Sequence, residues 1–568
     1  MKKKSGSVIA AAPPRAGIAL PFLVLAALAL AAVAAGTAPA SAGTLTPGLE
    51  ARLAPLAAGD VVKVLVVLRD QADIPALDRD LHAAKAALAV RHEAVVDALQ
   101  AAARGSQGPL LADLERLADP DRQAAPADKG AARVLGYTPH WLVNTVVVRA
   151  TVAAVRELAA RDDVERVEDD LVAVSLEPVS VKLDVPRPVA DKSGYVAPGV
   201  VAVGARRVWH ELGITGAGTL VANLDSGVDG EHPALADRWQ GHFGSTRAAW
   251  RDHANVGSRN LPVDLFGHGT HVMGTITGAT AFDTLGVAPG AHWLASNAIF
   301  SGDPDTYDNV IMAAFEWFAD PDGNPATRDD VPDVVHNSWG VQPDGSYVAC
   351  DSRWWSVIDN CEAAGVVVTF SAGNEGPAPG SLRSPADRAS SPVSSFAIGS
   401  TSTTEPHVVS GFSSRGPSGC GGPYAIKPEV MGPGENIYSC YPGGGYAYMD
   451  GTSMAGPHIA GVVALMREAA PDLDVTAIKE ILMATAVDLG APGEDNDYGW
   501  GFVDAYAAVS AVLHNAGTVA GHVRDAATGL PVAGAVVRDL RGLTQRTTGV
   551  DGAFRFTVLA GDASLRVA

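Results

Sequence analysis

The sequence predicts an α/β protein built on a doubly wound, mostly parallel sheet, preceded by a smaller α+β unit and followed by an all-β segment. Between residues 198 and 514, strand-like apolar runs alternate with helical patterns, as in a doubly wound sheet. Residues 365–370 are nearly all apolar, as expected of a parallel strand that is covered on both faces. Residues 331–335 fit less well, because Pro332 and Asp333 interrupt the run.

The composition is that of a large, acidic chain. Its 568 residues are enough for several domains. The formal net charge of −21 at pH 7 leaves no basic surface for nucleic acid, so nucleic acid is not expected as a partner.

Residues 1–42 carry the three parts of an export signal. Lysines follow the first residue, a mostly apolar run covers residues 16–35, and small residues occupy positions 40–42. That order predicts a secretory signal peptide and a secreted, extracellular protein. The alternative is a retained membrane anchor, because the run is about long enough to span a bilayer. Pro21 and the cleavage-type triplet favour removal, after which no stable membrane association is expected.

Residues 43–174 predict a small α+β unit. Strand-like runs and helical patterns follow in the order strand, helix, strand, helix, strand. The predicted strands are residues 61–68, 142–148 and 164–168, and the predicted helices are residues 76–103 and 152–161. The segment that follows, residues 175–197, contains several prolines and no periodicity, which predicts a linker.

Three motifs in the α/β region place reactive side chains at the ends of predicted elements. Asp225 follows an apolar strand, and His268 follows a glycine that opens a helix. Ser453 comes just before a helical pattern, where unpaired backbone N–H groups and the helix dipole favour developing negative charge. Taken singly, each has a plain structural interpretation, Asp225 as a capping acid and Ser453 as an ordinary N-cap.

In the order Asp, His, Ser, these motifs resemble those of the subtilisin-like serine proteases over nearly all of the α/β region. The resemblance implies a subtilisin-like fold. It makes Ser453 the nucleophile, His268 the general base and then acid, and Asp225 the carboxylate that orients the imidazole. His268 is preferred to His271 because it matches the first histidine of the family motif. His271 and His458 are expected to be structural.

The resemblance also implies which groups bind the substrate. Asn374 matches the side chain that donates to the oxyanion beside the backbone N–H of Ser453. Ser338, Trp339 and Gly340 match the edge segment whose main chain pairs with an extended peptide. Without the resemblance, Asn374 is typical of a turn and the other segment of a plain loop. Trp339 is bulkier than is usual there, and the layout looks closest to the bacillopeptidase F-like subtilases.

The N-terminal unit, residues 43–174, resembles the inhibitor-type propeptide of the same family, with a ferredoxin-like domain from about residue 59. The resemblance implies a folding chaperone and intramolecular inhibitor that the enzyme itself cuts off within the linker. The alternative is an independent N-terminal adhesion domain.

Four cysteines fall inside the predicted catalytic domain, residues 198–514. An even number in an exported protein suggests disulfides, and three pairings are open. The local pairs are preferred because they close the shortest loops: Cys350 with Cys361, and Cys420 with Cys440. Zinc is a poor alternative, because no CxxC or HxxxH spacing accompanies the cysteines.

The implied chemistry requires no cofactor, but proteases of this kind often hold structural calcium through loop oxygens. Two acidic clusters are noted, although an exposed acidic loop is more often simply solvated. They are Asp303, Asp305 and Asp308, and Glu494, Asp495 and Asp497. No EF-hand spacing is present, and no metal ligands are assigned.

The C-terminal part changes character after a predicted helix at residues 505–513. Residues 515–568 resemble a carboxypeptidase regulatory-like β-sandwich, expected to be truncated. Strand-like runs lie at residues 517–523 and 535–537, and a hairpin pattern at residues 549–556.

These features predict a secreted, monomeric serine endopeptidase, made as a self-processed zymogen, that hydrolyses proteins or peptides through an acyl-enzyme. Two other functions stay open. One is a pseudoprotease that only binds peptides, which the presence of Asp225, His268, Ser453 and Asn374 disfavours. The other is a surface adhesion or peptide-binding protein whose protease domain acts only in maturation.

Overall fold

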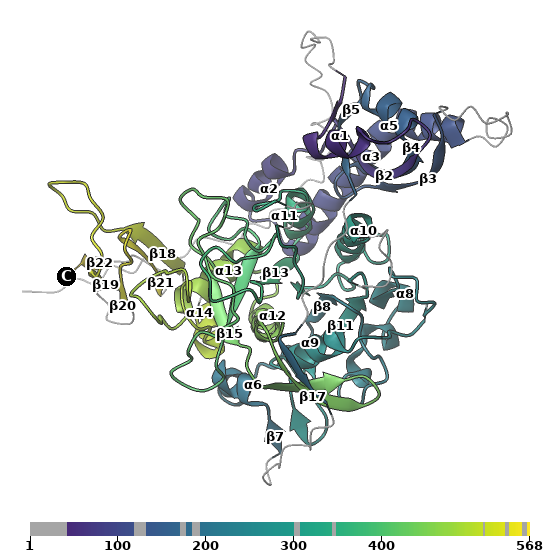
Figure 1. Ribbon diagram of the computed structural model, residues 1–568. Helices are drawn as coiled ribbons and strands as arrows, with labels where there is room; N and C mark the ends of the chain where they lie inside the picture. Colours follow the sequence, from purple (N-terminus) through teal and green to yellow (C-terminus); the bar gives the residue numbers. More distant parts are fainter. Residues whose placement is uncertain are drawn as a thin grey trace, which may run out of the picture. The chain divides into compact units, whose positions relative to one another are not determined.

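The computed structural model describes residues 42–118, 132–170, 178–183, 194–258, 260–299, 307–343, 348–514, 517–539, 545–558 and 565–567 (Figure 1). All of them belong to one compact unit, Ala42–Ala568. The predicted signal peptide lies almost entirely outside the described residues. Among the described residues, no helix is both long enough and apolar enough to cross a bilayer.

The N-terminal region is a five-stranded sheet with helices packed on it. The strands are β1 (Thr44–Leu45), β2 (Val61–Leu68), β3 (Val134–His140), β4 (Thr145–Thr151) and β5 (Val164–Asp169), in the order β1-β5-β2-β4-β3. The helices are α1 (Pro47–Leu53), α2 (Ile74–Ala83), α3 (Leu88–Ala118) and α5 (Val152–Ala159). Val64 and Val66 of β2 face the region's own core, whereas Leu65 joins the main core of the molecule. This is the alternation expected of a strand with both faces covered.

One helix expected in this region is two. The prediction of a single helix over residues 76–103 is wrong, because the chain turns between α2 and α3 with Lys85 in the left-handed region (φ 52°). The second helix then continues past the predicted end and through Pro109.

The strand expected at residues 142–148 is displaced. Residues 141–144 form a turn, and the strand that follows it pairs antiparallel with β3, which was not predicted. The apolar run was a poor guide to the start of the strand, because Leu142 and Val143 are buried in the turn. β3 escaped prediction because most of its residues are not buried and it contains Gly136 and Pro139, which are unusual inside strands.

The catalytic region is built on a seven-stranded, all-parallel sheet, which confirms the predicted α/β class. The strand order is β15-β14-β13-β12-β8-β11-β9. The bounds are β8 (Leu220–Leu224), β9 (Trp250–Arg251), β11 (His292–Ser296), β12 (Val334–Asn337), β13 (Val367–Ser371), β14 (Phe396–Thr401) and β15 (Val430–Pro433). Later strands lie on both sides of β8, so the order reverses there. Ligands of such sheets bind beyond the carboxyl ends of the strands at this point.

Helices cover the sheet. They are α6 (Pro198–Ala202), α7 (Ala205–Arg207) with the π-helical turn η1 (Val208–Leu212), α8 (Thr246–Ala249), α9 (His268–Thr277), α10 (Tyr307–Ala319), α11 (Trp355–Ala363), α12 (Thr452–Ala469), α13 (Val475–Thr485) and α14 (Ala505–Leu513). The short 3₁₀ turns η2 (Ala236–Arg238) and η3 (Gln240–His242) lie between β8 and α8. Every residue of α12 from Thr452 to Arg467 is buried. A helix that is buried all round lies inside a core, and α12 packs against α9, α14 and strands β12 to β15.

A hairpin delivers the chain to the start of α12. It consists of β16 (Ile437–Tyr441) and β17 (Gly445–Asp450), and β17 also pairs antiparallel with β6 (Ser180–Lys182) of the linker. A separate parallel pair joins β7 (Tyr195–Val196) to β10 (Asp283–Thr284).

The C-terminal region contains two small sheets. β18 (Gly517–His522) pairs with β21 (Ala553–Val558), while β19 (Val536–Asp539) pairs with β20 (Gln545–Thr547) and β22 (Leu565–Val567). The hairpin expected at residues 549–556 is wrong. The turn at these residues joins β20 to β21, but the two strands do not pair with each other. β20 pairs with β19 in one sheet, and β21 pairs with β18 in the other.

The predicted disulfide pairing is also wrong. The bridge joins Cys350 to Cys420, 70 residues apart, with a Cα–Cα distance of 5.0 Å that lies in the usual range. Cys361 on α11 and Cys440 on β16 are buried free thiols. The preference for short loops gave the wrong pairs because the side chains of Cys361 and Cys440 face the core. Cys350 and Cys420 instead lie in two loops that meet.

Candidate active site

Asp225 and His268 form a buried pair at the reversal point of the sheet. Asp225 directly follows β8, and its N–H donates to the Ser296 carbonyl of β11 (3.1 Å). His268 is the first residue of α9, after Gly267 in the left-handed region (φ 86°). His268 Nδ1–H donates to Asp225 Oδ1 (2.8 Å), and the side chains are 11% and 3% exposed. The same Oδ1 accepts from the Ser226 N–H (2.7 Å), which fixes the carboxylate.

Ser453 lies in the first turn of α12. Its Oγ is buried and makes no hydrogen bond with any described residue. The position at a helix N-terminus surrounds it with backbone N–H groups that lack helical partners. α12 packs on α9. Burial, with a smaller contribution from His268, lowers the pKa of His336 to about 3, and the ring of His336 lies against Gly456 of α12. His268 is therefore near this turn.

Asn374 lies beside the first turn of α12. Its Oδ1 accepts from the N–H and the hydroxyl of Thr452, each at 2.9 Å, which orients the carboxamide. A Cβ built on Gly451 would lie 3.5 Å from Asn374 Nδ2 and 3.6 Å from the backbone N of Ser453. Asn374 Nδ2 and the Ser453 N–H therefore border the same small space.

The segment Ser338, Trp339 and Gly340 follows β12, and two of its side chains are buried. Ser338 and Trp339 are 2% and 1% exposed. The Trp339 indole donates to Asn337 Oδ1 (2.9 Å) and packs edge-on against Trp354. The core thus accommodates the bulk of the Trp339 side chain.

The other motif histidines hold structure together, as expected. His271 Nε2 lies 3.0 Å from the Ile437 carbonyl and 3.2 Å from the Ala447 carbonyl, so it joins α9 to both strands of the hairpin. Burial lowers its pKa to about 3, with a further contribution from His268. His458 Nδ1–H donates to the Met454 carbonyl one helical turn back (2.9 Å).

Asp264 is a site residue that the sequence reasoning missed. Its two carboxylate oxygens accept from Ser226 Oγ (2.9 Å), from the N–H groups of Phe266 (2.9 Å), Gly267 (2.8 Å) and Thr270 (2.8 Å), and from Thr270 Oγ1 (2.7 Å). It thereby ties the end of β8 to the start of α9, where the Asp–His pair forms. An acid ahead of a glycine that opens a helix is the usual signal of an N-terminal cap, and that signal was present.

In the described acidic cluster, two of the carboxylates are bonded to protein groups. Asp495 accepts from three backbone N–H groups, at residues 491, 497 and 498, and Asp497 is paired with Arg415 (3.1 Å). Asp303 and Asp305 lie outside the described residues, as does the side chain of Asp308. Within the part of the chain that the structure describes, no three or more His, Cys, Asp or Glu side chains converge on a metal position.

A doubly wound fold with a buried Asp–His pair and a serine at a helix N-terminus is the arrangement that a serine hydrolase needs. A model of the Subtilase family matches residues 216–501, and the chain belongs to that family as a subtilisin-like serine protease. The chain is 35% identical over 459 residues to bacillopeptidase F of Bacillus subtilis (strain 168), covering 76% of this chain and 30% of that protein.

Two shorter relatives are covered more fully. Subtilisin E of Bacillus subtilis (strain 168) is 31% identical over 64% of this chain and 81% of its own length. M-protease of Shouchella clausii (strain KSM-K16) is 30% identical over 61% and 78%, respectively.

Proposed function

We propose that this protease is a secreted endopeptidase that works through Asp225, His268 and Ser453 and is made as a self-processed zymogen. The observation that carries the proposal is the buried hydrogen bond between His268 Nδ1 and Asp225 Oδ1 (2.8 Å), in a chain of the Subtilase family. That bond leaves His268 Nε2 as the nitrogen that takes a proton, which is the tautomer a general base needs.

The proposed reaction uses the groups already described. Ser453 Oγ attacks the scissile carbonyl carbon while His268 Nε2 takes the hydroxyl proton, and Asp225 stabilises the imidazolium. The oxyanion accepts from the Ser453 N–H and Asn374 Nδ2. Collapse breaks the C–N bond, and His268 returns the proton to the leaving amine. Water then hydrolyses the acyl-enzyme by the same steps in reverse, and no cofactor takes part.

The proposed substrates are proteins or peptides in an extended conformation. They bind by adding a strand to the main chain of residues 338–340, since the Ser338 and Trp339 side chains are buried. Main-chain pairing binds many sequences, so selectivity rests with pockets around it.

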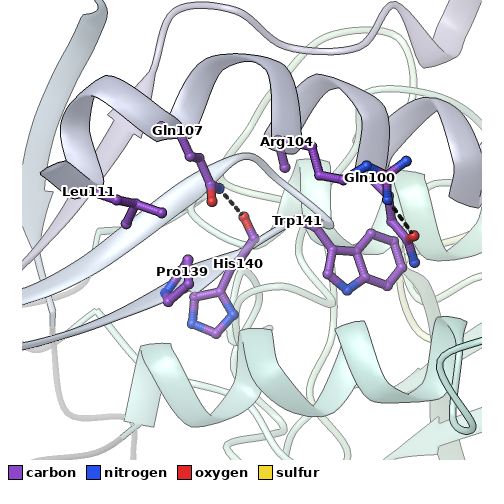
Figure 2. A pocket seen from close by; sticks show the side chains of 9 residues that line it. Gln100, Arg104, Gln107, Leu111, Pro139, His140 and Trp141 are labelled. Carbon is purple, nitrogen blue, oxygen red and sulfur yellow. Dashed lines mark hydrogen bonds between the residues drawn. The ribbon is translucent and has the colours of Figure 1, made fainter.

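Contacts of the N-terminal region with the catalytic region support the proposal of a zymogen. Glu316 Oε2 of α10 accepts from the backbone N–H groups of Trp141 (2.6 Å) and Leu142 (3.1 Å), and His140 Nε2 bonds Asn309 Oδ1 (2.9 Å). Within the N-terminal region, Gln107 Nε2 donates to the His140 carbonyl (2.8 Å) at the edge of a hollow between α3 and β3 (Figure 2). The contact thus joins the end of β3 and the turn after it to α10 of the catalytic region.

The linker passes close to the nucleophile. The N–H of Val179 donates to the Asp450 carbonyl (2.8 Å), and β6 extends the hairpin that ends three residues before Ser453. This proximity supports the proposal that the linker is cut by the chain's own active site.

The test is expression of the wild-type chain and of Ser453→Ala, followed by N-terminal sequencing and assay with a fluorogenic peptide. We expect the wild type to lose residues 43–174 and to cleave the added peptide, and the variant to keep those residues and to be inactive. Loss of residues 43–174 from a Ser453→Ala chain expressed alone would refute self-processing. Self-processing without cleavage of added peptides would favour the adhesion or peptide-binding alternative. Light scattering on the processed enzyme tests the proposed monomer, and its presence in the culture medium tests secretion.

A further inference from the structure

The carbonyl of the nucleophile Ser453 lacks its normal helical partner. In an α-helix this oxygen accepts from the N–H four residues on. In α12 that residue is Pro457, which has no N–H and whose ring crowds the same carbonyl. The turn that carries Ser453 therefore depends on support from outside the helix.

Ser338 supplies the missing donor from the end of β12. Its Oγ donates to the Ser453 carbonyl (3.2 Å) and also lies 2.9 Å from His336 Nε2. A serine hydroxyl has one proton, so it can donate to only one of these two groups. The tautomer of His336 decides whether Ser338 donates to the Ser453 carbonyl or to His336 Nε2.

The tautomer of His336 determines whether its ring donates to Ser338 or accepts from it. Its Nδ1 lies 2.9 Å from Thr369 Oγ1 of β13. If the threonine hydroxyl donates to Nδ1, the ring carries its proton on Nε2 and donates to Ser338 Oγ. The hydroxyl proton of Ser338 is then directed to Ser453. Burial lowers the pKa of His336 to about 3, with a contribution from His268, so the ring is neutral and has one donor and one acceptor.

Because residue 456 of α12 is glycine, the helix leaves room for the His336 ring. A Cβ built on Gly456 would lie 2.1 Å from Cε1 and 2.4 Å from Nε2 of His336. The imidazole fills the space that a side chain at position 456 would occupy. His336 and Gly456 are therefore complementary in shape, one turn below the nucleophile.

We propose that His336 is a positioning residue for Ser453. It directs the Ser338 hydroxyl to the Ser453 carbonyl and so holds the turn of α12 that presents both the nucleophile and its oxyanion N–H. No net proton transfer occurs along this series of hydrogen bonds, which runs from Thr369 through His336 and Ser338 to Ser453. This inference rests on the proposed role of Ser453.

The first test is the effect of His336→Phe on kcat and KM. Phenylalanine keeps the shape of the ring but cannot bond Ser338. We expect kcat to fall about 5- to 10-fold, the effect of one buried hydrogen bond, with KM unchanged within about twofold. His336→Gln, which can place a donor near the position of Nε2, should recover most of the loss. Adding His336→Phe to Ser338→Ala should cause no further fall in kcat. His232→Phe, a buried histidine that bonds the Gly445 carbonyl instead, is the matched control and should leave kcat within about twofold.

The second test uses shape. Gly456→Ala should lower the melting temperature and activity through collision with the ring, and adding His336→Ala should restore the melting temperature. An undiminished Gly456→Ala enzyme would overturn the proposal, as would a His336→Phe enzyme with full kcat.

A third measurement does not depend on those variants folding. The ¹⁵N spectrum of histidine-labelled Ser453→Ala chain should show His336 protonated on Nε2, and protonation on Nδ1 would overturn the proposal. Reaction with a serine-directed phosphonate distinguishes failure of the proposed function from failure of the positioning role of His336. A wild-type chain that does not react would refute the proposed function, whereas equal reaction rates of wild type and His336→Phe would refute only the positioning role.

Discussion

At the scale of single residues, the site depends on donors and acceptors that are already aligned. Asp225 is fixed by its own strand and by the Ser226 N–H, and it fixes His268 in turn. Asn374 is oriented by Thr452, which is the neighbour of the nucleophile. Groups held in this way need no reorganisation when charge develops, which is the largest source of catalysis in acyl transfer.

Asn374→Ala tests this alignment. Loss of one of two oxyanion donors should lower kcat by about 10²- to 10³-fold, the range seen for the equivalent donor in subtilisin, with little effect on KM. Steady-state kinetics on a peptide substrate measure both constants. A variant with unchanged kcat would show that Asn374 does not face the oxyanion.

At the scale of elements, Asp264 joins β8 to α9. A carboxylate accepts from every donor around it, whereas the amide of asparagine would place an NH₂ group against another donor. Asp264→Asn should therefore lower the free energy of unfolding by about 1–3 kcal/mol and reduce kcat by loosening His268. Denaturant unfolding and kinetics on the same preparation check both effects. A variant with normal stability but low kcat would instead indicate a direct role in the chemistry.

The contact of the N-terminal region with α10 should respond to pH. Burial alone lowers the pKa of His140, but hydrogen bonding and attraction from Glu316, with help from Asn309 and Asp170, outweigh burial and raise it. A raised pKa means that the charged pair stabilises the contact below the ordinary histidine pKa. This stabilisation is lost as pH rises through the raised value.

The unprocessed Ser453→Ala chain provides the measurement. Hydrogen exchange at Trp141 and Leu142 should become faster as pH rises beyond the intrinsic increase, which unstructured peptides calibrate. In the Glu316→Gln control, the excess over the intrinsic rate should disappear, because the partner charge is removed. The same excess in both chains would exclude His140 as its source.

At the scale of the whole molecule, one disulfide spans 70 residues of the catalytic region. Removing it with Cys350→Ser and Cys420→Ser should cost about 2–4 kcal/mol, because the closed loop no longer restricts the unfolded chain. Thermal unfolding measures the change. Cys361→Ser is the control, because Cys361 is a free thiol here but was paired with Cys350 in the sequence-based prediction. It should not reproduce the loss of the bridge, and a larger loss in Cys361→Ser than in the double variant would contradict the observed connectivity.

The parts of this molecule that the sequence could predict are those written in local patterns. Apolar runs indicated the buried parallel strands, and short motifs indicated Asp225, His268 and Ser453 at element ends. Features that depend on which distant segments meet were missed. The pairing of Cys350, the burial of Trp339 and the space that Gly456 leaves for His336 all depend on such contacts. Asp264 was predictable only in part. Its capping signal is local in the sequence, but its hydrogen bond with Ser226 joins residues 38 apart.

The central claim is that Ser453 is the nucleophile of a working protease. The most direct measurement is mass spectrometry of the purified enzyme after reaction with a serine-directed phosphonate, alongside peptide hydrolysis. The account predicts one adduct, on Ser453, that abolishes hydrolysis, and no adduct in Ser453→Ala. Hydrolysis that persists in Ser453→Ala, or an inactivating adduct on another residue, would contradict it.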